Sequence, residues 1–509
     1  MSQESQLASL AAEACTAPEP RRSEVIDQVV AIVAASGEGA ALRPLLAAVG
    51  PQFTSTESEL RNGATRLVAR VLSRLSAVSD DALGHLTDFF CSRLQDYACA
   101  SAVLDATSAL VALLPPASAR RAQICDALLD ESDVRSLAQA ERAAALRLTL
   151  ELSGAASDEP GGAGGGEGLI NGVPGARFVL GALRAFDGEK DPRNLLLYLQ
   201  LVRGLCRRCE EVGADGFGEA VAEVFDSLSF YFPISFAPPA DDENGITQAH
   251  LLTALLRTLR ATPRFAPLAF PFFLQHLTTP RLDGPEGPAP DAEIDSDAQM
   301  QALQGLATLA SAYGPQALAP HAEMVAHAMR AQLSQLLSLQ EGGSGVAAAT
   351  GAEFYARQAA ITEALRSLTR TCLQDAPLDT SAVAMDDGRP ADARPLLERV
   401  LTPVLGLCAA PRPQGPGAAI GGQLLRAVAL VAPAAAALAV ARCVPPLLQA
   451  VVQQGAVRAE QADALALLLA LLRAALDASL DTPADTCAPL PLSAYIEWNV
   501  DRHVDTRDG

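Results

Sequence analysis

Cysteine and histidine side chains at short spacings are the first candidates for chemistry in this sequence. Cys206 and Cys209 form a CxxC pair, a spacing found in metal and redox sites. A metal site needs about four ligands, and no second CxxC is present. Positions i and i+3 of a helix share a face, which usually points into the core. We interpret the pair as buried structural cysteines, and a cluster or redox site is the alternative.

Two further patterns resemble catalytic motifs but have the wrong spacing. His321 and His327 flank Glu323, yet they are six residues apart, whereas the zinc-protease helix needs histidines at i and i+4. The glycine run at 161–168 contains neither GxGxxG nor a following GK[ST]. Lys190 is the only lysine, so a P-loop is impossible. The sequence therefore predicts no enzyme, no cofactor and no metal site.

The elements that must position any functional residue are predicted to be helices. Leu83, Leu86, Phe90, Leu94 and Tyr97 recur at spacings of three and four, which places them on one helix face. The same periodicity predicts helices at 21–35, 40–49, 57–76, 80–95, 100–113, 118–130, 137–152, 176–186, 192–210, 216–230, 247–260, 264–277, 292–312, 316–338, 353–372, 393–408, 420–440, 443–454 and 458–478. Thr56 and Glu59 are expected to form a capping box, and Ile246 to pack on Leu251.

Successive helix pairs recur at roughly 40 residues, which is typical of HEAT and armadillo repeats. The predicted fold class is therefore all-α, a HEAT/armadillo-like helical-repeat solenoid, in which each pair buries its apolar stripe against its neighbours. The predicted segments are N-terminal repeats at 1–153, a Gly-rich flexible loop at 154–175, repeats at 176–280, a Pro/Gly-rich loop at 281–291, more divergent repeats at 292–479, and a poorly integrated tail at 480–509.

Composition indicates the kind of partner. The chain has 509 residues, 50% of them hydrophobic, and a net charge of −21, with a pI near 4.7. Because phosphate binding relies on Lys and Arg, direct nucleic-acid or anionic-membrane binding is not expected, and protein partners are favoured. Ten scattered cysteines indicate reduced thiols, and the N-terminus lacks a secretory signal pattern. The apolar stretch 427–441 is short for a membrane span, and we interpret it as buried helix.

Two loops carry the most distinctive residues. Gly188 is expected to end one helix in the left-handed conformation, and Asp191 and Pro192 to begin the next one. Helix punctuation does not require Glu189 or Lys190, so the loop is either purely structural or also a charged tip that contacts a partner. Residues 230–239 are rich in aromatics and prolines, and form either a plug between repeats or an exposed recognition patch.

The loop belongs to a longer run of residues that is similar to a known family. The matching stretches are Phe186-Asp187-Gly188-Glu189-Lys190-Asp191-Pro192-Arg193-Asn194-Leu195-Leu196, Val224-Phe225, residues 231–239, 244–246, 61–96 and 262–265. Together they resemble the methyl-methanesulfonate-sensitivity nineteen family, whose members are HEAT-repeat adaptors of cytosolic iron–sulfur assembly. The resemblance covers roughly residues 57–278. Family chains are about twice this length, so the likeness is to their N-terminal half.

This resemblance implies a function that periodicity does not show. It implies a non-catalytic adaptor that helps deliver iron–sulfur clusters to apoproteins of DNA repair, replication and transcription. The implied partners are other subunits of the targeting complex and apo-enzymes such as repair helicases, in the nucleus and cytoplasm. Glu189, Lys190 and Arg193 are the candidate partner-binding residues. The alternatives are a nuclear-transport-like receptor for basic cargo, and a cluster carrier that uses Cys206 and Cys209.

Overall fold

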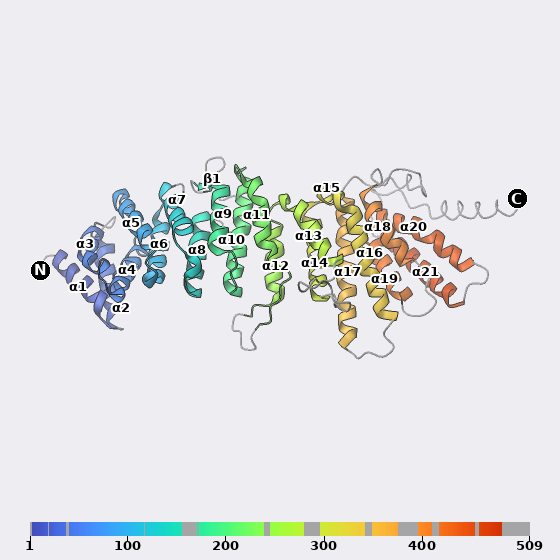
Figure 1. The fold of residues 1–509 in the computed structure, drawn as a ribbon, viewed down its shortest axis with the longest axis horizontal. Coiled ribbons are helices and arrows are strands. Elements are labelled where there is room, and N and C mark those ends of the chain that lie inside the picture. Colours follow the sequence, from blue (N-terminus) through green and yellow to red (C-terminus); the bar gives the residue numbers. More distant parts are fainter. Residues whose placement is uncertain are drawn as a thin grey trace, which may run out of the picture. The chain divides into compact units, whose positions relative to one another are not determined.

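A computed structural model describes residues 3–18, 20–36, 40–116, 118–154, 169–170, 173–238, 245–278, 296–341, 349–374, 395–409, 417–452 and 458–480. The chain divides into two compact units, Met1–Phe265 and Ala266–Gly509. Figure 1 shows that helices make up nearly all of the described elements. The predicted all-α fold class, a stack of helical repeats, is confirmed.

The first unit stacks its helices in two layers. The α-helices are α1 (Gln3–Thr16), α2 (Arg21–Ala35), α3 (Leu42–Phe53), α4 (Ser58–Leu72), α5 (Asp80–Arg93), α6 (Ala100–Leu113), α7 (Ala119–Asp126), α8 (Gln139–Ser153), α9 (Gly175–Phe186), α10 (Pro192–Glu211), α11 (Phe217–Ser229) and α12 (Gln248–Leu259). Single turns are η1 (Tyr97–Cys99), the π-helical η2 (Ala127–Glu131), η3 (Val134–Ser136) and η4 (Pro263–Phe265). Helices α4, α6, α8, α10 and α12 pack side by side as one layer, and α5, α7 with η2, α9 and α11 form the other.

The second unit repeats this arrangement. Its helices are α13 (Ala266–Thr278), α14 (Ser296–Tyr313), α15 (Pro315–Leu318), η5 (Ala319–His321), α16 (Ala322–Glu341), α17 (Ala349–Leu373), α18 (Leu396–Cys408), α19 (Gly417–Ala429), α20 (Pro433–Val452) and α21 (Arg458–Leu480). Helices α14, α17, α19 and α21 pack in sequence as one layer, while α13, α16, α18 and α20 form the other. Each helix therefore buries its apolar stripe against neighbours from the adjacent repeats.

The apolar residues predicted to share one face at 83–97 are buried, with one exception. Leu83, Leu86, Phe90 and Leu94 are buried as predicted, but Tyr97 is 44% exposed. The helix ends at Arg93, so Tyr97 begins the separate turn η1 and leaves the buried face. Its hydroxyl instead accepts a hydrogen bond from the backbone N–H of Asp133 at 2.9 Å.

Several predicted boundaries are wrong, each for a local reason. Helix α4 starts at Ser58 with Glu57 at its N-cap and no side-chain cap, so the expected Thr56 capping box does not form. The single helix expected at 316–338 is broken into α15, η5 and α16, with Pro320 in the 3₁₀ turn. Pro433 begins α20 instead of interrupting a helix at 420–440, because proline is well placed in a first turn.

Two elements were not expected at all. Helix α1 lies in the acidic, polar N-terminal region, where Leu7 and Ala11 are buried and give the stripe that was overlooked. Within the region expected to be a flexible loop at 154–175, Leu169–Ile170 and Val173–Pro174 form an antiparallel pair of two-residue strands, β1 and β2. The predicted loop at 281–291, residues 481–509 of the predicted tail, and Trp498 lie outside the described residues.

One described helix, α20, has the length and apolarity of a membrane span, and 56% of its apolar window is buried in the structure. The pair α5 and η1–α6 would pass the same test only as a single span bent by 110°. A buried helix of this composition is also what the core of a helical stack contains. The stretch expected to be one buried helix, 427–441, is interrupted at 430–432.

Ion pairs between neighbouring repeats add to the stability that apolar packing provides. Ion pairs join side chains that lie 35 to 54 residues apart in the sequence, which is one repeat or slightly more. In the first unit they are Arg61–Asp96 at 2.7 Å, Arg120–Asp80 at 2.5 Å, Arg142–Glu189 at 2.8 Å and Arg264–Glu210 at 2.7 Å. Arginine suits this role because its planar guanidinium group can donate two parallel hydrogen bonds to a carboxylate. The repeats are thus joined by specific contacts as well as by apolar surface.

Candidate partner-binding site

The loop between α9 and α10 punctuates the two helices as predicted. Gly188 has φ of +77°, which is the left-handed conformation expected after the end of α9. The Asp191 carboxylate caps α10 by accepting hydrogen bonds from the backbone N–H groups of Arg193 at 3.0 Å and Asn194 at 3.1 Å. Pro192 occupies the first turn of that helix. The loop therefore has a fixed backbone.

Glu189 is buried, so it does not belong to the exposed charged tip that was one of the two alternatives for this loop. Its side chain is only 3% exposed and forms a bidentate ion pair with Arg142 of α8, with distances of 2.8 and 2.9 Å. It also accepts hydrogen bonds from the backbone N–H groups of Lys190 and Asp191 and from the Asn194 amide. Of the two alternatives for the loop, Glu189 therefore fits the structural one. The side chain turns inward because five donors converge on it, and it links the loop to the preceding repeat.

The surroundings of Glu189 also control its ionisation. Burial alone raises the pKa of its carboxyl group, but the hydrogen bonds from Arg142, from the Asp191 backbone and from Asn194 outweigh burial and lower the pKa to about 2. The same pairing raises the pKa of the Arg142 guanidinium group, since the hydrogen bond to Glu189 favours its charged form. Both groups are charged at neutral pH, and the pair acts as a staple between α8 and the loop.

A second chain of contacts joins the loop to the following repeat. The Asp187 carboxylate accepts a hydrogen bond from the Ser227 hydroxyl of α11 at 2.7 Å. That hydroxyl is also 2.8 Å from the hydroxyl of Tyr198, which is fully buried in α10. Contacts on both sides therefore hold the loop between α8 and α11, and its position relative to three successive repeats is fixed.

Lys190 and Arg193 remain exposed on this fixed loop and the first turn of α10. In the described part of the chain, neither the Lys190 ammonium group nor the Arg193 guanidinium group makes an ion pair or a hydrogen bond. Two of the three predicted partner-binding residues are thus presented to solvent on a rigid backbone, and the third, Glu189, holds that backbone in place. Partner contact by Lys190 and Arg193 stays a prediction.

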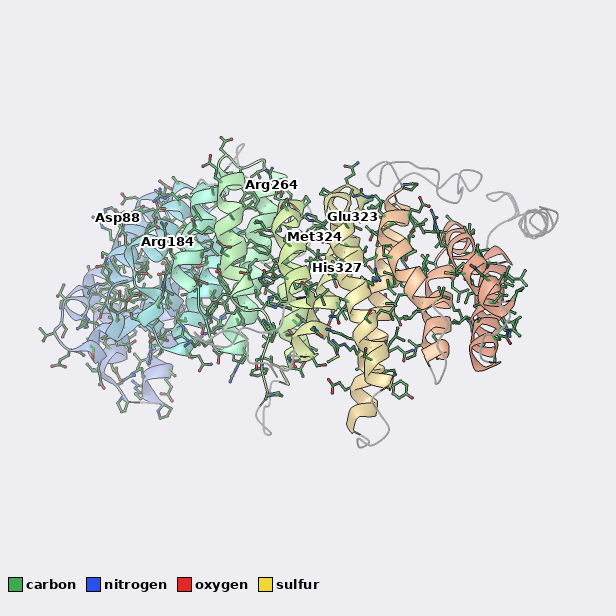
Figure 2. The ribbon with its side chains drawn as sticks, turned by 45° about the vertical axis from the view of Figure 1, so that its right-hand side comes forward. Asp88, Arg184, Arg264, Glu323, Met324 and His327 are labelled. Carbon is green, nitrogen blue, oxygen red and sulfur yellow. The ribbon has the colours of Figure 1, made fainter. Side chains whose placement is uncertain are left out.

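A pocket of about 350 Å³ lies between η2–η3 and the end of α9. Its lining includes the charged side chains of Asp130, Asp133, Arg135 and Arg184, the last of which is labelled in Figure 2. Arg184 pairs with Asp130 at 3.0 Å, and Arg135 donates to the Arg184 backbone carbonyl. The charges of this pocket are therefore largely satisfied within the fold.

Cys206 and Cys209 lie in the core of α10. They are 0% and 1% exposed, which confirms the expectation that the pair faces inward. Burial raises the pKa of both thiols, in Cys209 to about 12, so neither is an available thiolate at neutral pH. Within the described residues no three His, Cys, Asp or Glu side chains are grouped closely enough to hold a metal ion.

The aromatic segment after α11 has buried and exposed residues, so its structure is compatible with each of the two alternatives that the sequence left open. Phe232 and Ile234 are buried, at 7% and 4% exposure, so these two side chains pack into the fold. Phe230 is different, because it is 77% exposed and rests edge-on against Tyr231 at 5.9 Å. The described segment is therefore partly buried: Phe232 and Ile234 face inward, whereas Phe230, Ser235, Ala237 and Pro238 are exposed.

The sequence did not predict the residues of the preceding repeat that contact the loop. Arg142 pairs with Glu189 from 47 positions away, and Gln139 contacts both Asp191 and Asn194 from the same helix turn. No local pattern marks such partners. A signal was nevertheless available, because an unexplained acidic residue in a loop and an arginine about one repeat earlier are the expected ends of an inter-repeat ion pair.

Comparison with known proteins identifies the family. Residues 46–335 match the MMS19 N-terminal family, described as a Dos2-interacting transcription regulator of RNA-Pol-II. This chain belongs to the MMS19 family. The match includes the loop at 187–191 and both repeats that hold it, so the predicted family resemblance is confirmed.

Two MMS19 relatives and one solved structure show the extent of the likeness. The MMS19 nucleotide excision repair protein homolog of Danio rerio is 32% identical over 273 residues, which are 52% of this chain and 23% of that protein. The DNA repair/transcription protein MMS19 of Saccharomyces cerevisiae is 41% identical over 101 residues, 20% of this chain and 9% of that protein. A structure of the karyopherin Kap121p bound to the extreme C-terminus of the phosphatase Cdc14p covers 94% of this chain and 43% of Kap121p, at 13% identity and a TM-score of 0.46. The matched part of this MMS19 chain spans about a quarter of the length of the relatives from Danio rerio and Homo sapiens.

Proposed function

We propose that this chain is a non-catalytic adaptor of cytosolic iron–sulfur protein assembly, which helps deliver iron–sulfur clusters to apoproteins of DNA repair, replication and transcription. The observation that carries the proposal is membership of the MMS19 family over residues 46–335. Relatives in that family are named as nucleotide excision repair and DNA repair/transcription proteins. The proposed clients are apo iron–sulfur enzymes of these processes, such as repair helicases.

The architecture suits an adaptor because a stack of repeats offers a long surface for other proteins. Exposed Lys190 and Arg193 stand on a loop that Glu189 and Asp187 tie to neighbouring repeats. Charges on a rigid frame can set the register of a partner without first being ordered, which lowers the entropic cost of binding. We infer that these two residues contact another subunit of the assembly targeting complex or a client.

The proposed adaptor acts in the nucleus and cytoplasm through protein contacts, without direct binding to nucleic acid or membrane. The net charge of −21 supports this, since an acidic protein is repelled by phosphate groups unless a basic surface offsets the repulsion. The buried thiols of Cys206 and Cys209 favour an adaptor over a cluster carrier, because ligation would require exposed thiolates.

Affinity capture with the full 509-residue chain tests this function. The wild type should retain assembly subunits and apo iron–sulfur enzymes, as identified by mass spectrometry. The variant Lys190→Glu with Arg193→Glu should retain less of them at physiological salt while its melting temperature stays unchanged. Arg43→Glu, an exposed arginine on α3, is the control and should capture normally.

Two results would contradict the adaptor function, and a third would contradict the contact residues. Retention of basic peptides in place of iron–sulfur proteins would indicate a transport-like receptor. A visible iron–sulfur absorption band in the isolated chain after anaerobic reconstitution would indicate a cluster carrier. Equal capture by wild type and the double variant would remove Lys190 and Arg193 from the set of contact residues.

A further inference from the structure

The layer formed by α4, α6, α8, α10 and α12 has an exposed face that is rich in arginine. Each helix packs against its neighbours in the layer and against the second layer, so its exposed positions recur every three to four residues on the remaining side. These positions hold Arg66 and Arg70 on α4, Arg147 on α8, and Arg257 and Arg260 at the end of α12. We call these five side chains the arginine row.

The two other helices of the layer, α10 and α6, contribute further charged side chains to this face. Arg193 of α10 is exposed at its first turn, and Arg203 and Arg207 lie half-buried further along the same stripe. Helix α6 contributes an exposed Asp105. Glu59, in the first turn of α4, and Glu211, at the end of α10, are further exposed carboxylates of the layer, and Glu211 lies 3.7 Å from Arg208. In a chain with 59 acidic and 38 basic residues, a face on which arginines predominate is the reverse of the overall balance.

Many arginines elsewhere in the first unit are used differently, although Arg43, Arg74 and Arg193 are also exposed. Arg61, Arg120, Arg142, Arg177 and Arg264 all form ion pairs that join neighbouring repeats. Arg184 and Arg264, labelled in Figure 2, belong to the second layer or its following turn, and both are paired. By contrast, none of the five guanidinium groups of the arginine row makes an ion pair or hydrogen bond within the described residues.

Folding alone does not account for the row. Arg66 and Arg70 are like charges at i and i+4, an arrangement that destabilises a helix by about 0.2–0.5 kcal/mol. The helix macrodipole favours cations only in the last turn, which includes Arg70 and Arg257 but not Arg66 or Arg147. The macrodipole therefore accounts for Arg70 and Arg257, whereas nothing in the described fold stabilises Arg66 or Arg147, and a binding role explains these two side chains.

The chemistry of the face selects an acidic polypeptide as the partner. A basic cargo would be repelled. Single-stranded nucleic acid is bound by aromatic platforms as well as by cations, and the only aromatic side chain in the five helices, Tyr198, is fully buried. Guanidinium groups pair well with carboxylates through two parallel hydrogen bonds. An extended segment rich in Asp and Glu matches both the sign and the geometry.

We propose that the arginine row docks an acidic, extended segment of a partner protein across α4, α6, α8, α10 and α12. This inference rests on the proposed adaptor function, which gives the face a protein partner, but binding of an acidic peptide can be measured without any client. Adjacent helices pack about 8–10 Å apart, so five helices span about 32–40 Å. An extended chain covers about 3.3 Å per residue, so about 10–12 residues cross the face.

A direct binding measurement tests the proposal on the full chain. A fluorescein-labelled 12-residue peptide of Asp, Glu and Ser should bind, with affinity falling as salt rises from 50 to 150 mM, because the contacts are ionic. A 6-residue peptide of the same charge density reaches only half of the layer and should bind at least about tenfold more weakly. Fluorescence polarisation measures both affinities.

Matched charge reversals then locate the site. Arg147→Glu should weaken binding of the 12-residue peptide several-fold, and Arg66→Glu with Arg70→Glu by about tenfold or more. The control Arg43→Glu makes the same charge change on an exposed arginine of α3, outside the layer, and should change affinity less than twofold. Circular dichroism at 222 nm checks that every variant is folded.

The possible outcomes are distinct. Equal weakening by Arg43→Glu and Arg147→Glu would show only a general charge effect and overturn the site. Absence of peptide binding would overturn it too. Tighter binding of a 12-nucleotide single-stranded DNA, abolished by the row variants, would make nucleic acid the ligand and refute an acidic peptide. If the arginine-row variants still capture clients, the adaptor function stands without the row. If the chain binds the peptide but captures no client, the adaptor function is refuted and the row remains a peptide-binding site.

Discussion

Replacing Glu189 by glutamine tests whether the loop between α9 and α10 is held by a buried charge. Glutamine has nearly the same shape, but it has one acceptor oxygen where the carboxylate has two. If its oxygen occupies the Oε1 position, the new NH₂ group faces the Nε of Arg142 and the amide of Asn194, which are both donors. One charged hydrogen bond and one neutral hydrogen bond are therefore lost.

The expected cost follows from typical values for such bonds. A hydrogen bond to a charged group contributes about 1.5–3 kcal/mol and a neutral one about 0.5–1.5 kcal/mol. Part of this is recovered, since the Arg142 side chain is 25% exposed and can be hydrated, and Asn194 keeps its bond to the Gln139 carbonyl. We expect the free energy of unfolding to fall by about 3 kcal/mol, which lowers the melting temperature of the first unit, Met1–Phe265, by about 5 °C.

Thermal unfolding followed by circular dichroism measures this change, with Lys190→Gln as the neighbouring control. That exposed side chain should shift the melting temperature by less than about 2 °C. Because the pKa of Glu189 is lowered on folding, its stabilisation is complete above the unfolded value of 4.5 and is lost as the pH falls towards 2. The difference between wild type and Glu189→Gln should therefore shrink at pH 3. If the melting temperatures of wild type and Glu189→Gln differ by less than about 1 °C at pH 7, the ion pair between Glu189 and Arg142 does not stabilise the fold as argued.

Three further substitutions test other parts of the structure. Gly188→Ala should cost about 1 kcal/mol through backbone strain alone, because φ is +77° and no atom lies within 4 Å of the added Cβ; an unchanged melting temperature would contradict that conformation. Gly305→Ala should cost about 1–3 kcal/mol in the second unit, since its Cβ would lie 2.5 Å from the ring of Phe273, and calorimetry measures the loss. Cys206→Ser with Cys209→Ser should leave bound metal and client capture unchanged, and loss of a stoichiometric metal, measured by mass spectrometry, would favour the carrier alternative.

The sequence predicted those features that depend on neighbouring residues. Periodicity located most helices, and α2 and α6 have the predicted bounds, because an amphipathic stripe with local breaks is visible within a short window. The caps at Gly188 and Asp191 were predicted for the same reason. The role of Glu189 was left open because its environment comes from Arg142, 47 residues away. Which side of a charged loop faces solvent depends on the neighbouring repeat, and no local pattern contains that information.

The same limit explains why the arginine row was not predicted, although every arginine in it is visible in the sequence. Arg61 and Arg66 lie five residues apart on α4, and this spacing does not predict which of them forms an ion pair. Arg61 faces the next repeat and pairs with Asp96, whereas Arg66 faces solvent, and no ion pair to it forms within the described residues. In a repeat stack, one helix face is fixed by its neighbours and the other is free to serve partners. An excess of one charge on the free face, opposite in sign to the net charge of the chain, therefore points to binding more directly than any short motif does.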